Sequence, residues 1–87
     1  MAKYAYVIDG FSGLQIIDIS NPASPIIVGR VETPGYTDGV YVKGNYAYVT
    51  NGSFGLQVIN ISNPASPAIV GSVKTPGSAR GVCVPEN

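Results

Sequence analysis

The chain has 87 residues with five basic and five acidic side chains, which leaves room for one small domain and gives no electrostatic basis for binding nucleic acid. Charged residues make up only 11% of the chain and the mean hydropathy is +0.21, so little polar surface is available to coat a monomer. With one cysteine and no histidine, the chain can build neither an internal disulfide nor a histidine-based metal site.

Residue types and turn signals predict an all-β chain. Val and Ile together number 20, against two Leu and one Met, and branched side chains favour strands over helices. Clusters of Gly, Pro, Asn and Asp interrupt the apolar segments and are typical of turns. They bound four strands in the first half of the chain, at residues 4–8, 14–20, 26–33 and 39–43.

The second half of the chain repeats the first. An offset of 42 aligns residues 4–45 with residues 46–87, and 27 of the 42 pairs are identical. Periods of about 40 to 50 residues belong to propeller blades or helical arrays, and the seven prolines exclude long helices. Four short antiparallel strands per period predict one propeller blade. The chain therefore divides into a start segment, residues 1–3, and two blade units, residues 4–45 and 46–87.

The second predicted strand is apolar on both faces. Leu14 and Ile16 alternate with Gln15 and Ile17, and Ile19 follows. A sheet covered on one side alternates between apolar and polar residues, whereas a sheet packed between two others does not. We therefore expect each blade to be sandwiched between neighbouring blades.

The segment Leu-Gln-Ile-Ile-Asp at residues 14–18 and the segment Leu-Gln-Val-Ile-Asn at residues 56–60, each followed by Ile-Ser-Asn-Pro, resemble the LVIVD repeat. Asn60 replaces the aspartate of that motif. The resemblance implies a β-propeller and a cell-surface parent protein of bacterial or archaeal type, and it implies no particular chemistry. The sequence itself assigns no location: it shows no signal peptide and no apolar run long enough to span a membrane, so we expect no membrane partner.

Two blades cannot close a ring, because propellers need about four to eight. We expect the first and last strands to present unpaired edges that copies of the chain satisfy head to tail, by exchanging a strand. A homotrimer would have six blades and a homotetramer eight, and the sequence leaves both open. The predicted assembly interface consists of Tyr4, Ala5, Tyr6, Val7, Gly81, Val82, Cys83 and Val84.

Charge differences between the repeats suggest a second site. Asp38 in the first repeat corresponds to Arg80 in the second, both just before the strand expected to be innermost. Around a closed ring these charges would alternate at the mouth of the central channel, and drift in surface loops is the alternative. Tyr36 lies near the same position, so a small polar ligand or a glycan could bind there.

The sequence offers little catalytic chemistry. The absence of histidine removes the usual triads and zinc or copper sites. Cys83 lies between valines in a predicted strand, where a buried and inert thiol is expected. Asp9-Gly10 could indicate a calcium-binding loop, but the second repeat has Asn51 in place of Asp9. Asp-Gly is also typical of a tight turn, and we prefer that interpretation. We predict no enzyme activity, no cofactor and no metal.

Two hypotheses follow for the function. The first is a structural fragment of two blades, excised or engineered, that assembles with itself into a symmetric β-propeller. The second is a binding module that uses the central funnel for a polar ligand or glycan, as propellers often do.

Overall fold

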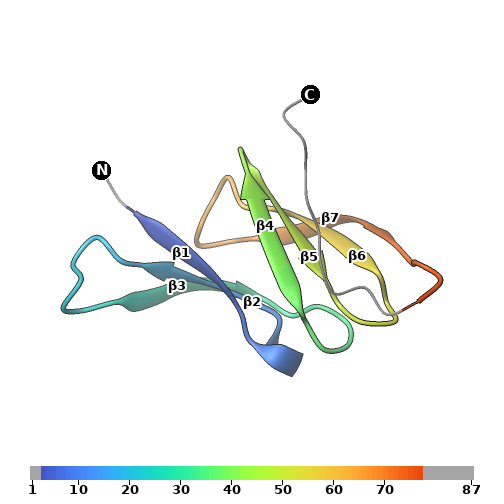
Figure 1. Ribbon diagram of the computed structural model, residues 1–87. Helices are drawn as coiled ribbons and strands as arrows, with labels where there is room; N and C mark the ends of the chain where they lie inside the picture. Colours follow the sequence, from blue (N-terminus) through green and yellow to red (C-terminus); the bar gives the residue numbers. More distant parts are fainter. Residues whose placement is uncertain (1–2, 78–87) are drawn as a thin grey trace.

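The computed structural model describes residues 3–77, and these form two antiparallel β-sheets (Figure 1). The first sheet has the order β1-β2-β3 and the second β4-β5-β6-β7. The strands are β1 (Tyr4–Ile8), β2 (Leu14–Asp18), β3 (Ile26–Val31), β4 (Gly39–Lys43), β5 (Tyr46–Thr50), β6 (Leu56–Asn60) and β7 (Ala68–Val73), with a short 3-10 helix, η1 (Gly10–Ser12). Within residues 3–77, no helix is long and apolar enough to cross a bilayer.

The all-β prediction is confirmed, and the strands predicted within residues 3–77 are found in place. β2 and β3 each end two residues earlier than predicted. β2 ends because the Asp18 carboxylate accepts a hydrogen bond of 2.8 Å from the Ser20 N–H, which turns the chain away from the sheet. β3 ends at Val31, and the connection to β4 that follows contains the buried Thr33.

The boundary between the sheets does not follow the boundary between the sequence repeats. β4 pairs with β5 through the Gly44-Asn45 turn, with Gly39 opposite Thr50 and Lys43 opposite Tyr46. The second sheet therefore has the four strands expected of a blade. The first sheet has three among the described residues, because the last strand of the first repeat joins the second sheet.

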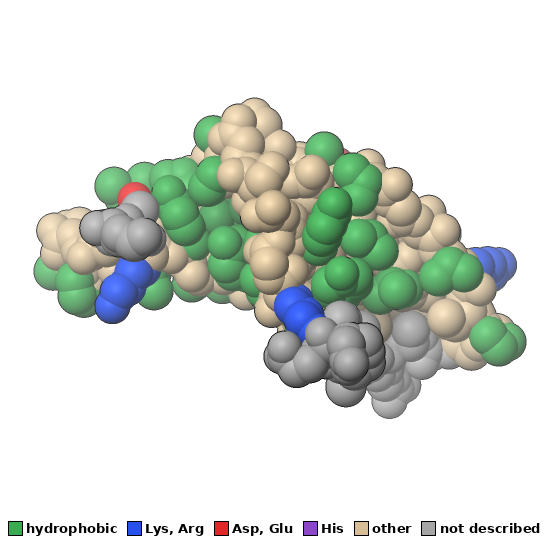
Figure 2. Space-filling view, turned by 90° about the horizontal axis from the view of Figure 1, so that it is seen from above, with side chains coloured by type: hydrophobic (Ala, Val, Ile, Leu, Met, Phe, Trp, Pro, Cys, Tyr) green, Lys and Arg blue, Asp and Glu red, His purple; other side chains and the backbone are tan. Residues whose placement is uncertain are grey.

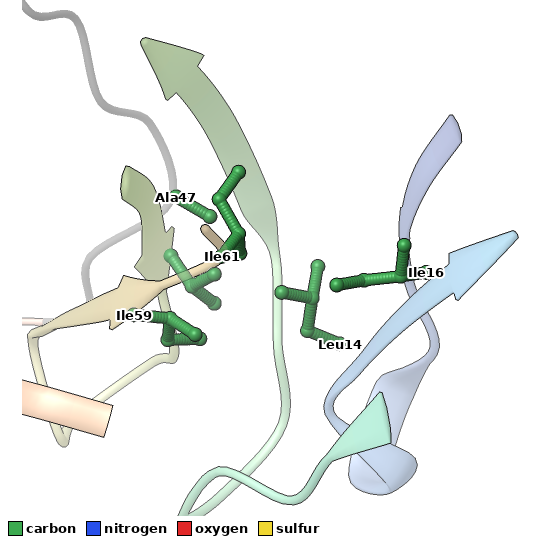
Figure 3. Packing of buried hydrophobic residues seen from close by; sticks show 6 residues of the cluster. Leu14, Ile16, Ala47, Ile59 and Ile61 are labelled. Atoms are coloured by element: carbon green, nitrogen blue, oxygen red, sulfur yellow. The ribbon is translucent and has the colours of Figure 1, made fainter. Parts of the chain in front are cut away.

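The hydrophobic core lies between the two sheets. Leu14 and Ile16 of β2 are fully buried against side chains of the second sheet, and Figure 3 shows them pointing towards it. The other buried hydrophobic residues of the cluster are Ala47 and Val49 of β5, Ile59 of β6, and Ile61 just after β6. The two sheets are thus held face to face by apolar contacts, as neighbouring blades of a propeller are.

Candidate functional site

The contact between the sheets defines an inner face on each. On the first sheet, Tyr6 lies opposite Ile16 and Ile8 lies opposite Leu14, so these four side chains project from one face, the first inner face. All four belong to the core cluster or pack against it. The opposite side of this sheet, the first outer face, carries the intervening residues of the same strands, among them Val7.

On the second sheet, Ala47 lies opposite Ile59 in the pairing of β5 with β6. Both side chains are fully buried and point to the first sheet together with Val49 and Ile61, which defines the second inner face. The second outer face carries the alternate residues, with Tyr48 opposite Val58.

The outer face of each sheet repeats the inner face of the other. A shift of 42 residues converts the first inner face into the second outer face: Tyr6 becomes Tyr48 and Ile16 becomes Val58. The same shift converts the first outer face into the second inner face, so that Val7 becomes Val49. Within residues 3–77, the two outer faces therefore form a second pair of the surfaces that hold the two sheets together, and this second pair is not packed against another sheet.

Burial differs sharply between the used and unused surfaces. Val49 is fully buried between the sheets, whereas its equivalent Val7 is 41% exposed. Ile61 is 5% exposed and its equivalent Ile19 is 39% exposed. Figure 2 shows many apolar and few charged side chains on the face that it presents. Uncovered apolar area of this kind marks interaction surfaces.

The outer edge of β1 is open within the described part of the chain. The Lys3 carbonyl accepts a hydrogen bond and the Asp9 N–H donates one on the side of β2. In an antiparallel strand the backbone groups of alternate residues point to opposite edges. Those of Tyr4, Tyr6 and Ile8 therefore point away from β2, where no other strand of residues 3–77 pairs with β1.

In the second sheet, the corresponding edge of β5, the repeat equivalent of β1, is paired with β4. The predicted assembly residues Tyr4, Ala5, Tyr6 and Val7 thus lie on an open edge. Their predicted partner strand, residues 81–84 with Cys83, lies outside the described residues, so its position is not tested.

The predicted channel-mouth residues lie in the connection between β3 and β4. Tyr36 is 53% exposed, and its ring packs edge-on against Phe11, with centroids 5.0 Å apart. Asp38 is exposed, and its N–H donates a hydrogen bond of 2.8 Å to the Thr50 carbonyl. Arg80 lies outside the described residues.

One shallow depression lies away from Tyr36 and Asp38. It has a volume of about 280 Å³. Its lining consists of Ile27, Val28, Gly29, Arg30 and Ala65. The predicted channel-mouth residues Tyr36 and Asp38 do not line this depression.

Asn51 is a structural residue that the sequence analysis did not identify. It is fully buried, and its Nδ2 donates a hydrogen bond to the Pro34 carbonyl. On the other side of the connection, the N–H and hydroxyl of Thr37 both donate to the Gly10 carbonyl, at 3.0 and 2.8 Å. The connection between the sheets is thus fixed to a turn of each. In the sequence, this role is indicated only by the second repeat having Asn51 where the first has Asp9. The structure leaves Asp9 exposed.

The aspartate position of the repeat motif caps a turn. Asp18 accepts from the Ser20 N–H at 2.8 Å, and Asn60 accepts from the Ser62 N–H at 2.9 Å. Hydrogen bonds from the Ser20 hydroxyl and N–H lower the pKa of Asp18. An amide oxygen fills this role as a carboxylate does, which explains how Asn60 replaces aspartate. Among the described residues, no group of three acidic, His or Cys side chains is placed to hold a metal ion.

The family model of the LVIVD repeat matches the chain twice, at residues 2–33 and 34–75. The boundary between the two matches falls in the connection from β3 to β4, where the first sheet ends and the second begins. No curated protein and no solved structure matches the chain. Since the two matches span most of its length and follow its two sheets, the chain belongs to the LVIVD-repeat family.

Proposed function

We propose that the chain is a non-catalytic β-propeller module that closes a ring by associating head to tail with copies of itself. The observation that carries this proposal is the repetition of each inner face on the outer face of the other sheet. The second outer face, with Tyr48 and Val58, is the repeat equivalent of the first inner face. The first outer face, with Val7 and Ile17, is the repeat equivalent of the second inner face. The two outer faces should therefore pack together as the two inner faces do.

Such an interface is heterologous, because the two surfaces that meet are different. The second sheet of one copy would pack against the first sheet of the next, and so on around the ring. Burial of Val7 and Ile19 to the extent of Val49 and Ile61 would supply the apolar driving force. A ring of three copies has six blades and a ring of four has eight, both within the range that propellers use.

The open edge of β1 supports the same arrangement. Unpaired backbone groups at a strand edge are a template for another strand. In the second sheet, β4 fills this place beside β5. We propose that residues 81–84 of one copy, the repeat equivalent of β4, pair with β1 of the next copy, so that each ring contact combines a face and an edge.

The second candidate is ligand binding at the channel mouth formed by Tyr36, Asp38 and Arg80. It is favoured by the exposed aromatic pair of Phe11 and Tyr36, which are 76% and 53% exposed. Exposed ring faces of this kind stack on sugars. A rise in melting temperature with a panel of neutral and acidic glycans would support this function, and the absence of any shift would count against it.

Hydrogen exchange at the β1 edge tests the assembly proposal. We expect the amides of Tyr4, Tyr6 and Ile8 to exchange as slowly as those of Tyr46 and Thr50, because a strand from another copy covers them. On dilution until single chains dominate, this protection should disappear at β1 and remain at β5. Fast exchange at β1 at all concentrations would contradict the proposal, as would protection that dilution leaves unchanged.

A further inference from the structure

Gly29 occupies a place in β3 where no side chain fits. It lies opposite Ile16 on the first inner face, next to a bulge in the pairing of β2 with β3. A Cβ atom there would come within 1.9 Å of the Pro64 carbonyl oxygen and 3.2 Å of the Pro67 ring. The connection from β6 to β7 therefore passes directly over β3, and glycine is required by this close approach of two backbones.

Gly71 is the repeat equivalent of Gly29, and nothing among the described residues requires it. It lies in β7 opposite Val58, next to the same bulge. A Cβ atom there would meet only the Cβ of Val58, at the ordinary contact distance of 3.9 Å. Glycine often marks a bulge, but Gly71 does not have a positive φ, and the close backbone approach that requires glycine at position 29 has no counterpart here within residues 3–77.

The loop of residues 21–25 is the repeat equivalent of the loop that covers Gly29. Both read Asn-Pro-Ala-Ser-Pro and have the same turn: the side chains of Asn21 and Asn63 each accept from the alanine N–H two residues on, at 3.2 Å. Residues 21–25 are exposed, whereas Pro64 and Pro67 are half-buried. The first loop thus has the turn of the second but covers no strand among residues 3–77, and such preorganisation favours docking.

We infer that Gly71 is the point on the second outer face where the loop of residues 21–25 of a second copy docks, with the Pro22 carbonyl over Gly71 as the Pro64 carbonyl lies over Gly29. This inference rests on the proposed function and adds a specific contact to it. Because a loop from the first sheet docks on a strand of the second sheet, the contact fixes the direction of the ring and the register between copies.

Gly71→Val tests this contact, with Ser72→Val as the matched control. An added Cβ atom makes only an ordinary contact at position 71 within one chain, and the valine side chain would meet the docking loop of the next. We expect the dissociation constant of the assembly to rise about tenfold or more for Gly71→Val. Ser72 is exposed and projects from the other side of β7, so its variant should assemble as the wild type does. Circular dichroism checks that both variants fold.

The loop offers a second pair of variants, should Gly71→Val fail to fold. Pro25→Asp places a charge at the equivalent of Pro67, which contacts the Gly29 position, whereas Ser24→Asp places it at the equivalent of Ser66, which stays exposed. We expect only Pro25→Asp to weaken assembly. A wild-type oligomer that neither Gly71→Val nor Pro25→Asp weakens would overturn this inference and leave the proposed function standing. A monomeric wild type would overturn both.

Discussion

Replacing Gly29 by alanine should lower the free energy of unfolding by about 2–4 kcal/mol. The added Cβ atom would lie 1.9 Å from the Pro64 carbonyl oxygen, so β3 and the connection from β6 to β7 would have to move apart. Both are backbone segments and cannot yield as a flexible side chain does. Separating them also loosens the contact of Leu14 and Ile16 with the second sheet.

Urea unfolding at a fixed protein concentration measures this effect, since association also contributes to stability. Arg30→Ala is the matched control: the residue is adjacent in β3, exposed, and on the other face of the sheet. We expect it to change stability by less than about 0.5 kcal/mol. Equal and small effects of the two variants would show that the close approach at Gly29 does not hold the sheets together.

Replacing Asn51 by aspartate should destabilise the chain by about 3 kcal/mol or more at neutral pH. The side chain is fully buried and donates to the Pro34 carbonyl. An ionised carboxylate cannot donate this bond, and burial disfavours its charge, which raises the pKa of the introduced group in the folded chain. The connection between the sheets would lose its attachment to the β5–β6 turn.

The effect of Asn51→Asp should depend on pH in a defined direction. A carboxyl whose pKa is raised by folding destabilises the folded chain above that pKa, and stability returns as the pH falls towards its ordinary value of about 3.9. The protonated acid can again donate to Pro34. Asp9→Asn, the reverse change at the exposed equivalent position, should alter stability little. Unfolding curves at several pH values compare the two, and an equal loss at pH 7 and pH 4 would contradict the assignment.

The strands could be predicted from the sequence because the turn residues that end them act locally. Asp9-Gly10, Asn21-Pro22 and Gly44-Asn45 end apolar runs whatever the rest of the chain does, so β1 and β4 have the predicted bounds. The face-to-face packing could also be predicted, since Leu14 and Ile17 put apolar groups on both sides of β2. The early end of β2 could not, because it depends on the hydrogen bond of one rotamer of Asp18.

The polar contacts between the sheets were not predictable from patterns. Asn51-Gly52 is a turn signal in any β-protein, and its burial follows only from how the connection from β3 to β4 crosses it. Gly29 looks like an ordinary strand residue until Pro64 is placed over it. The burial of Asn51 and the close approach at Gly29 both depend on how the two sheets pack against each other. The pattern of residues within one strand does not determine that packing.

The native mass of the assembly tests the central claim most directly. We predict a single species of three or four times the 9.0 kDa of one chain, with the same mass at all concentrations well above the dissociation constant. Native mass spectrometry distinguishes these and gives the number of blades at once. A mass of 9.0 kDa at every concentration, or a ladder of sizes with no upper limit, would contradict the closed ring.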